Sequence, residues 1–275
     1  MKIIKDKVAV ITGAASGIGR SLAQQLAAQG AKVMMADWNA EGLAENQKLI
    51  ESQGGQTAIF RLDVSKREEV EALFQKTLDH FGQADILINN AGVAIANQTT
   101  LRQVTWEQYE WIVGINFWGV VYGTKTFLPY FLQRPEAHIV NISSVFGLMG
   151  VATNGPYCST KFAVRGFTET LVQELWGTQV GITCVHPGGI KTNIVKHAAG
   201  FEEDKKDQEK AIRDFEAAAR TTPDQAATLI IHAIQKNKRR LLIGGDAYFI
   251  DWIVRLFPST YHSRMMKMMK KMLER

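Results

Sequence analysis

Tyr157 and Lys161 lie four residues apart in the stretch "PYCSTK" (156–161). On an α-helix, residues at positions i and i+4 occupy the same face. A phenol has a reference pKa of about 10, and a fixed positive charge beside it favours the phenolate and lowers that pKa. We therefore expect Lys161 to tune Tyr157 for proton exchange near neutral pH. The same pair also occurs on ordinary helix surfaces, so the rest of the chain must decide between the two interpretations.

A glycine-rich stretch, "TGAASGIG" (12–19), follows a short apolar run and opens an amphipathic segment. Gly13, Gly17 and Gly19 leave room for a pyrophosphate, which the free N–H groups of a helix N-terminus bind well. The spacing is G-x-x-x-G-x-G, which differs from the G-x-G-x-x-G of the common dinucleotide fingerprint. A simple tight turn is the alternative, but the strand–turn–helix context favours dinucleotide binding.

Asp37 ends the second apolar run, eighteen residues after Gly19. An acid at this place can accept hydrogen bonds from the adenosine ribose, and its charge repels a 2′-phosphate. The glycine-rich stretch contains no basic residue that would recognise a phosphate, and Ser16 precedes Gly17. These residues predict NAD as the coenzyme, with NADP disfavoured. The alternative is that Asp37 only caps a helix starting near Asn39.

Short apolar runs alternate with longer amphipathic runs along the chain. The expected strands are 7–12, 31–37, 57–63, 85–90, 138–143, 181–186 and 240–244. The expected helices include 17–29, 39–53, 67–81, 106–133 and 156–177. Strands that are apolar on both faces and separated by helices predict one doubly wound, Rossmann-like α/β sheet with helices on both faces. Such sheets bind ligands beyond the carboxyl ends of their strands, which is where the motifs fall.

The composition is that of an ordinary globular protein, with 275 residues, 46% hydrophobic and 21% charged. The net charge of +5 is concentrated in residues 264–275, which contribute five basic residues against one acid, so we expect no nucleic-acid surface. Cys158 and Cys184 form neither a metal-ligand spacing nor a disulfide framework, and we expect no metal. The chain starts without a signal peptide and has no apolar stretch of roughly 18 residues, which predicts a cytoplasmic protein.

Several motifs occur in an order that resembles the short-chain dehydrogenase/reductase family over about residues 5–245. They are "TGAASGIG" at 12–19, "DV" at 63–64, "NNAG" at 89–92, "N" at 116, "SS" at 143–144, "YCSTK" at 157–161 and "PGGIKT" at 187–192. The resemblance implies an oxidoreductase domain over residues 1–245, with a substrate lid at about 190–220.

The resemblance also implies roles for individual residues. The implied catalytic residues are Ser144, Tyr157, Lys161 and Asn116. Ser144 is preferred to Ser143 because family members place this serine thirteen residues before the tyrosine. The implied coenzyme-binding residues are Gly13, Ser16, Gly17, Ile18, Gly19, Asp37, Asp63, Val64, Asn90, Ala91, Gly92, Tyr157, Lys161, Pro187, Gly188, Ile190 and Thr192.

This set has a coherent chemistry. Hydride transfer between an alcohol carbon and a nicotinamide requires the hydroxyl proton to move as well. Tyr157 would supply that proton during reduction and remove it during oxidation. Ser144 would donate a hydrogen bond to the carbonyl oxygen, where negative charge develops.

The residues expected around the substrate are mainly apolar. They are Phe146, Leu148, Met149, Val151 and Ile190, with Asn154 as a polar exception. Such a lining suits a lipophilic substrate, although the same side chains could be loop core. We therefore expect an NAD-preferring enzyme acting on a hydrophobic secondary alcohol and its ketone, or on a related carbonyl. The alternatives are an NADP-linked 3-oxoacyl-thioester reductase and a catalytically inactive nucleotide-sensing partner protein.

Residues 246–275 form an extension beyond the resemblance. In "SRMMKMMKKMLER" (263–275), the methionines and Leu273 can share one helical face opposite the basic residues. Such a stripe is typical of packing against the protein or a sister subunit, and a basic amphipathic helix can instead lie on an anionic membrane. We expect a homodimer or homotetramer, with pairing through the helices at 106–133 and 156–177.

Overall fold

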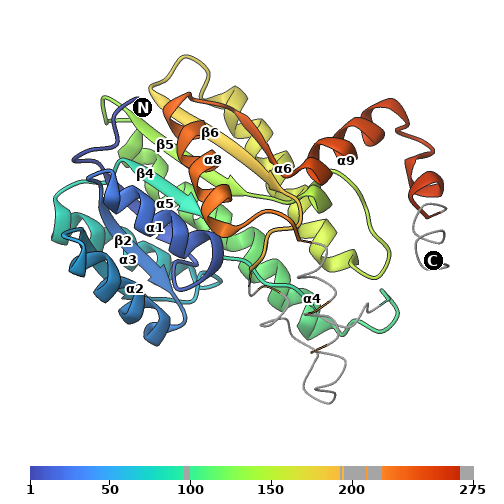
Figure 1. Cartoon of the computed structure of the whole chain (residues 1–275), viewed down its shortest axis with the longest axis horizontal. Coiled ribbons are helices and arrows are strands. Elements are labelled where there is room, and N and C mark those ends of the chain that lie inside the picture. Colours follow the sequence, from blue (N-terminus) through green and yellow to red (C-terminus); the bar gives the residue numbers. More distant parts are fainter. Residues whose placement is uncertain (96–99, 193, 195–208, 210–212, 214–218, 267–275) are drawn as a thin grey trace.

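The computed structural model describes residues 1–95, 100–192, 194, 209, 213 and 219–266 (Figure 1). These residues contain a seven-stranded parallel sheet with the strand order β3-β2-β1-β4-β5-β6-β7. The strands are β1 (Val8–Thr12), β2 (Lys32–Asp37), β3 (Gln56–Arg61), β4 (Ile86–Asn89), β5 (Ala137–Ile142), β6 (Val180–Pro187) and β7 (Arg240–Ile243). The predicted Rossmann-like fold is confirmed, and each expected strand is present within two residues of its predicted bounds.

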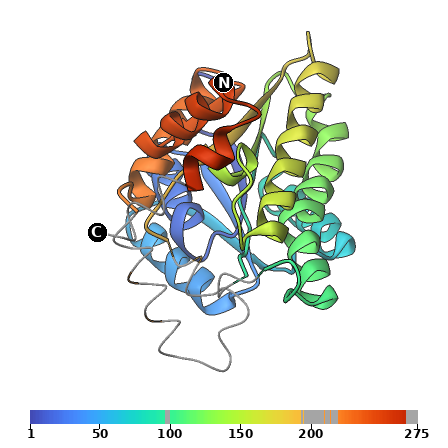
Figure 2. The same ribbon diagram turned by 90° about the vertical axis from the view of Figure 1, so that its right-hand side faces the viewer.

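Helices cover both faces of the sheet, as Figure 2 shows for α8 on one side and α5 and α6 on the other. The helices are α1 (Gly17–Ala28), α2 (Ala40–Ser52), α3 (Arg67–Phe81), α4 (Trp106–Val113), α5 (Gly119–Phe131), α6 (Gly155–Glu174), α8 (Pro223–Gln235) and α9 (Gly245–Leu256). The last described residues, 261–266, are also helical. Helix α9 lies at the β7 side of the molecule in Figure 1.

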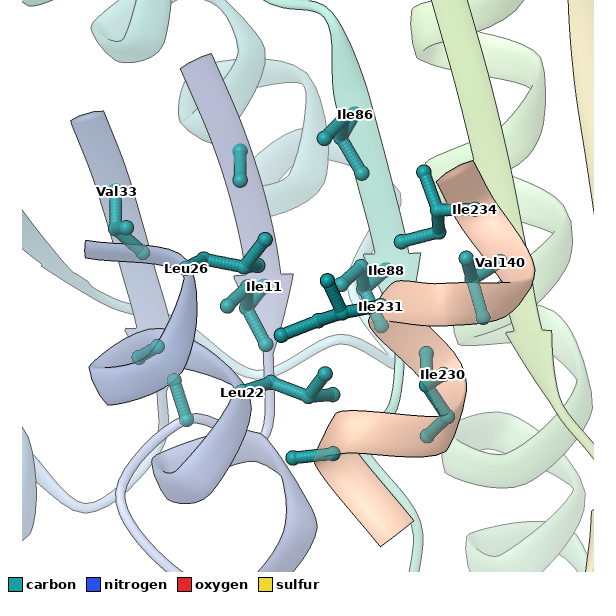
Figure 3. Packing of buried hydrophobic residues seen from close by; sticks show 14 of the residues in the cluster. Ile11, Leu22, Leu26, Val33, Ile86, Ile88, Val140, Ile230, Ile231 and Ile234 are labelled. Carbon is teal, nitrogen blue, oxygen red and sulfur yellow. The ribbon is translucent and has the colours of Figure 1, made fainter. Parts of the chain in front are cut away.

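Alternate residues of each central strand enter opposite hydrophobic clusters. Ile11 of β1 packs with α1 and α8 in one cluster, whereas its neighbour Val10 packs with α3 and α5 in the other. Figure 3 shows the first cluster, where Leu22 of α1 and Ile231 of α8 meet over Ile11 and Ile88. Burying one such side chain contributes roughly 1.5–3 kcal/mol, so both faces of the sheet stabilise the fold.

The helical segment predicted at 106–133 is present over residues 106–131. Its residues form α4, then a π-helical turn over Gly114–Trp118, and then α5. The π-turn itself was not predicted. The π-turn contains Asn116, which is fully buried, and its side chain bonds a distant loop instead of facing solvent. Such turns are frequent at functional sites.

A chain of buried polar side chains lies between the sheet and the helices α5 and α6. The Asn89 amide nitrogen donates to Asn141 Oδ1 at 2.8 Å and to Thr124 Oγ1 at 3.2 Å, and the Asn141 amide donates to Thr168 Oγ1 at 3.1 Å. Gly123 of α5 faces this chain, because a Cβ at its position would overlap the Asn89 side chain. The close approach of α5 to β4 thus requires a glycine.

Two helical glycines, Gly123 and Gly166, allow a test of the packing at Asn89. We expect Gly123→Ala to destabilise the protein by about 1–3 kcal/mol, because the new methyl group overpacks the polar chain at Asn89. Gly166→Ala on α6 is the matched control, since a Cβ there meets nothing within 4 Å. It should stabilise the helix by about 0.5–1 kcal/mol. Urea unfolding of both variants measures the difference, and equal effects would contradict the packing at Asn89.

Candidate active site

The loop between β1 and α1 approaches the loop after β4 so closely that side chains are excluded. Gly13 has φ +70°, and a Cβ there would lie 2.8 Å from both Ala91 Cα and Asn90 Nδ2. A Cβ on Gly19 would overlap the Gly13 carbonyl oxygen. The glycine spacing therefore gives a positive φ at Gly13 and a close backbone approach at Gly19, and leaves the N-terminus of α1 accessible to an anion.

Hydrogen bonds cross-link these two loops. Thr12 Oγ1 accepts from the backbone N–H groups of Asn90 and Ala91, both at 3.1 Å. In return, the Asn90 side chain donates to the carbonyl oxygens of Thr12 at 2.9 Å and Gly13 at 3.1 Å. Sequence reasoning missed Thr12, although a threonine ending a strand that is otherwise apolar is a usable signal.

Asp37, at the end of β2, holds the glycine loop from the other side. Its Oδ2 accepts from the Ala15 N–H and its Oδ1 from the Asn39 N–H, both at 3.0 Å. The side chain that caps α2 is that of Asn39, which accepts from the Gly42 N–H at 3.0 Å. The structure therefore gives Asp37 a different role from helix capping. Ser16 is the N-cap residue of α1, and Ile18 packs against the core.

The two residues expected near the adenine differ in their surroundings. Asp63 Oδ1 accepts from the Ser65 N–H at 2.9 Å and from its hydroxyl at 2.7 Å, which closes a turn after β3. Val64 is buried in the hydrophobic cluster beneath α5 and packs against Gly119. Val64 thus has a packing role in addition to any contact with a ligand.

The loop after β6 also reaches the glycine loop. The Gly188 N–H donates to the Ile243 carbonyl oxygen at 2.9 Å, and the Gly189 N–H donates to Asp246 Oδ2 at 2.7 Å. Farther along, Thr192 lies so close to Gly17 that a Cβ on the glycine would be 3.2 Å from Thr192 Cγ2. Sequence reasoning missed Asp246, which belongs to α9.

Ser144, Tyr157 and Lys161 come together where β5 and its following 3₁₀ turn meet α6. The Ser143 hydroxyl donates to the Lys161 carbonyl oxygen at 2.8 Å, so this serine joins the strand end to the helix. Ser144 Oγ accepts from the Phe146 N–H at 3.1 Å and interacts with the Tyr157 hydroxyl. The two serines therefore have different environments, and only Ser144 faces the tyrosine hydroxyl.

Lys161 places an ammonium group inside the protein. Its side chain is buried, Nζ donates to the Ile142 carbonyl oxygen at 3.0 Å, and Nζ lies 5.6 Å from the centre of the Tyr157 ring. No carboxylate of the described residues forms an ion pair with it. Burial lowers the pKa of Lys161 to about 8, since desolvation disfavours the charged form.

The pKa of Tyr157 moves opposite to the prediction. Burial raises it to about 12, and the hydrogen bond with Ser144 only partly offsets this. Phe146 packs edge-to-face on the ring, with the ring centres 6.0 Å apart. The predicted lowering was wrong because desolvation by the surrounding protein is the largest influence on this pKa, while the ammonium lies over the ring face and donates to a backbone carbonyl.

Asn116 fixes the loop after β4 next to this pair. Its Oδ1 accepts from the Val93 N–H at 2.8 Å, and its amide nitrogen donates to the Val93 carbonyl oxygen at 2.9 Å. A Cβ on Gly92 would lie 3.3 Å from Asn116 Oδ1 and 3.4 Å from Lys161 Nζ. Gly92 therefore allows this loop, the π-turn and Lys161 to meet.

His186 supports the serine from behind, a contact that sequence reasoning also missed. His186 is fully buried, and its Nδ1 lies 3.1 Å from the Ser144 carbonyl oxygen. A carbonyl oxygen only accepts, so Nδ1 carries the proton. Burial lowers the pKa of His186 to about 4, which keeps the ring neutral near pH 7.

The residues expected to line the substrate site divide into two groups. Leu148 and Met149 are buried against α9, and Ile190 belongs to the core cluster of α1 and α8. These contacts favour the loop-core interpretation for them. Phe146 and Val151 are only partly buried, and the Asn154 amide donates to the Ala152 carbonyl oxygen at 3.3 Å. Most of the expected lid at 190–220 lies outside the described residues.

The described residues hold no group of three or more His, Cys, Asp and Glu side chains arranged to bind a metal ion. Among their helices, none combines the length and the apolar character needed to cross a bilayer.

Comparisons with known proteins agree with this geometry. The family model described as short chain dehydrogenase matches residues 7–203. The oxidoreductase SadH of Mycobacterium tuberculosis is 41% identical over 264 residues, which cover 95% of this chain and 94% of that protein. A short chain dehydrogenase/reductase from Burkholderia phymatum, crystallised with NAD, superposes with a TM-score of 0.85 at 31% identity, covering 94% and 95% of the chains. Levodione reductase superposes with a TM-score of 0.79 at 27% identity, covering 89% of this chain and 98% of that one.

The buried ammonium makes stability depend on pH. Because folding lowers the pKa of Lys161 from 10.5 to about 8, the unfolded chain holds more protons between these values, and stability from this group rises with pH there. We expect the unfolding free energy of the wild type to rise relative to Lys161→Met between pH 8 and about 10. Urea unfolding across this range measures it, with the exposed Lys76→Met as control. Parallel curves for wild type and Lys161→Met would contradict the buried charge.

Proposed function

The chain belongs to the short-chain dehydrogenase family and is an NAD(P)-dependent oxidoreductase, and we propose that it interconverts a hydrophobic secondary alcohol and its ketone with NAD as the preferred coenzyme. One observation carries this proposal. Ser144, Tyr157 and Lys161 lie together beside the loop after β4, and that loop contacts the glycine loop after β1.

The residues around these loops fit a nicotinamide dinucleotide. At Gly13 and Gly19 a side chain would collide with the neighbouring backbone and with Asn90, so these glycines allow the tight turn that brings the N-terminus of α1 to where it would bind the pyrophosphate. Asp37 would accept hydrogen bonds from the adenosine ribose, and Lys161 would bind the nicotinamide ribose. The loop from Pro187 to Thr192 would border the nicotinamide. When bound, the coenzyme supplies or accepts the hydride.

Side chains of this protein would transfer the proton of the substrate hydroxyl group. Since the pKa of Tyr157 is raised to about 12, its hydroxyl is protonated at neutral pH and suited to donate to the carbonyl oxygen during reduction. The Ser144 hydroxyl would donate a second hydrogen bond to that oxygen, where charge grows. During oxidation Tyr157 must accept the proton, and the Lys161 ammonium would stabilise the transient phenolate by its charge.

The preference for NAD rests on Asp37. Its carboxylate has about four acceptor positions, and the N–H groups of Ala15 and Asn39 use two of them, so ribose hydroxyls can use the others. Its charge would repel the 2′-phosphate of NADP. This argues against the NADP-linked 3-oxoacyl-thioester reductase.

The proposal of a hydrophobic substrate rests on two partly buried side chains, Phe146, which packs on the Tyr157 ring, and Val151, which follows in the same loop. Apolar side chains with few polar groups favour a lipophilic alcohol or carbonyl compound over a small polar one.

A spectrophotometric screen of alcohols and carbonyls with NAD and NADP tests this function. We expect NAD-linked turnover of hydrophobic secondary alcohols and ketones, and a loss of about 10²- to 10⁴-fold in kcat for Tyr157→Phe with coenzyme binding retained. Comparable rates with NADP would contradict the role of Asp37, and activity only on small polar compounds would contradict the hydrophobic substrate. If Tyr157→Phe leaves the protein's function unchanged, the result would favour the catalytically inactive nucleotide-sensing protein.

We also propose that the protein pairs with copies of itself. The outer face of α9 carries Tyr248, Phe249, Trp252 and Leu256, which are 44–61% exposed and lie within one arc of the helix. The exposed Trp118 and Phe162 offer a second apolar surface on the helices around α5 and α6. Contact with a sister subunit would cover such surfaces, as exposed patches of this kind usually mark an interface.

Trp252→Ser tests the α9 face. If this face contacts a sister subunit, the variant should show a lower mass than the wild type in sedimentation equilibrium. Trp176→Ser is the control, because Trp176 is also exposed but lies outside α9, stacked under Arg239. Unchanged mass would contradict subunit contact. Flotation of the wild type with anionic vesicles, lost in Trp252→Ser, would assign this face to a membrane surface instead.

A further inference from the structure

We propose that Asp246 is a positioning residue that fixes the turn at Gly188 and Gly189 and thereby sets the affinity for the coenzyme. Asp246 lies in the first turn of α9, beyond the motifs that define the coenzyme fold. The inference depends on the proposed function in one respect, namely that the turn after β6 borders the coenzyme.

The first argument is the hydrogen-bond pattern of the turn. After β6 ends at Pro187, the Gly188 N–H still pairs with β7 through the Ile243 carbonyl oxygen at 2.9 Å. The next N–H, that of Gly189, points away from this pairing and donates to Asp246 Oδ2 at 2.7 Å. A hydrogen bond to a carboxylate is stronger than a neutral one. Asp246 thus provides the hydrogen-bond acceptor that the sheet no longer provides at Gly189, where the chain turns.

The second argument is steric. A Cβ on Gly188 would overlap the Asp246 carboxylate, and so would a Cβ on Gly244. Gly244 has φ +97°, which favours glycine in any case. Gly188 has no positive φ, and the three nearest atoms to its added Cβ all belong to Asp246. The close approach of this carboxylate therefore explains the glycine at 188.

The third argument is that α9 holds the carboxylate firmly in place. Ala247 and Ile250 pack into the buried cluster of Leu148 and Met149. Asp251, one turn farther along, pairs with Arg240 of β7 with an Nη1–Oδ2 distance of 3.0 Å. A carboxylate in the first turn of a helix is also stabilised by the helix dipole. The group that holds the turn is thus itself carried by a packed and ion-paired helix.

The turn continues toward the loop that would bind the pyrophosphate. Ile190 is buried in the core and bridges to Thr221, and Thr192 contacts Gly17 of the glycine loop. A shift at Gly189 would therefore propagate to both sides of the coenzyme site. Asp246 touches none of the proton-transferring residues, so its removal should act mainly on coenzyme binding.

Three variants test this inference by titration with NAD and by thermal unfolding. Asp246→Ala should weaken NAD binding by about tenfold, in line with the loss of one hydrogen bond to a charged acceptor, and should raise KM for NAD more than it lowers kcat. Asp246→Asn should keep much of the affinity, since its amide oxygen can still accept from the Gly189 N–H. Asp224→Ala is the matched control, because Asp224 is also a first-turn helix carboxylate but is exposed on α8, and it should lower the melting temperature slightly with little change in NAD affinity.

Two results would overturn the inference. One is an NAD affinity of Asp246→Ala within twofold of the wild type. The other is an equal loss of affinity in Asp224→Ala, which would assign the effect to the loss of any first-turn helix carboxylate and not to the bond with Gly189. If the wild type binds neither NAD nor NADP, the proposed function fails instead, and this outcome is distinct from both.

A double-mutant cycle tests the contact without the coenzyme. Gly188→Ala should lower the melting temperature strongly, because its methyl group collides with the carboxylate. In the Asp246→Ala background the methyl group has room, so the same change should cost less, and the two effects should be non-additive. Additive effects in thermal unfolding would overturn the steric argument whether or not NAD binds.

Discussion

Hydrogen bonds from side chains to loop backbone hold the loops of the proposed site, and the position of every proposed site residue depends on them. Beyond the carboxyl ends of the strands the sheet no longer pairs these N–H groups and carbonyls, and an unpaired buried backbone group is costly. Thr12 and Asn116 supply the missing partners to the loop after β4, Asp37 to the glycine loop, and Asp246 to the turn after β6. The glycines of these loops have no side chains, so the hydrogen-bonded loops can approach one another closely.

The second constraint is the desolvation of Tyr157, which is partly buried, and of Lys161, which is buried. Burial favours the neutral form of each, raising the pKa of the phenol to about 12 and lowering that of the ammonium to about 8. In the proposed mechanism the pair would therefore favour proton donation, and the reverse reaction would use the charge of Lys161 to stabilise a phenolate. Both side chains come from α6, which is tied to the end of β5 by the hydrogen bond from Ser143 to the Lys161 carbonyl oxygen. That junction would thus set the geometry of the proposed proton transfer.

The sequence predicted those features whose causes are local. Seven strands could be recognised because they are short apolar runs, and the helices because longer amphipathic runs separate these strands. The π-turn could not be predicted, because its buried Asn116 bonds Val93, twenty-three residues earlier. The direction of the Tyr157 pKa depends on burial by the whole fold. Asp246 escaped prediction for a similar reason, since its partner lies fifty-seven residues away in the chain.

Helix α9 joins the two sides of the proposed site. Its first turn carries the carboxylate that holds the turn after β6, while its buried face packs on Leu148 and Met149, which follow Ser144 along the chain. Tyr261, in the segment after α9, extends this packing, and its hydroxyl lies within 3.4 Å of the Gly150 nitrogen. A change in the packing of α9 would therefore move the serine-bearing loop and the turn at Gly189 together. Because protein cores are densely packed, such a displacement cannot be absorbed within the helix itself. We therefore expect α9 and Tyr261 to contribute to aligning the proposed coenzyme with the proposed substrate.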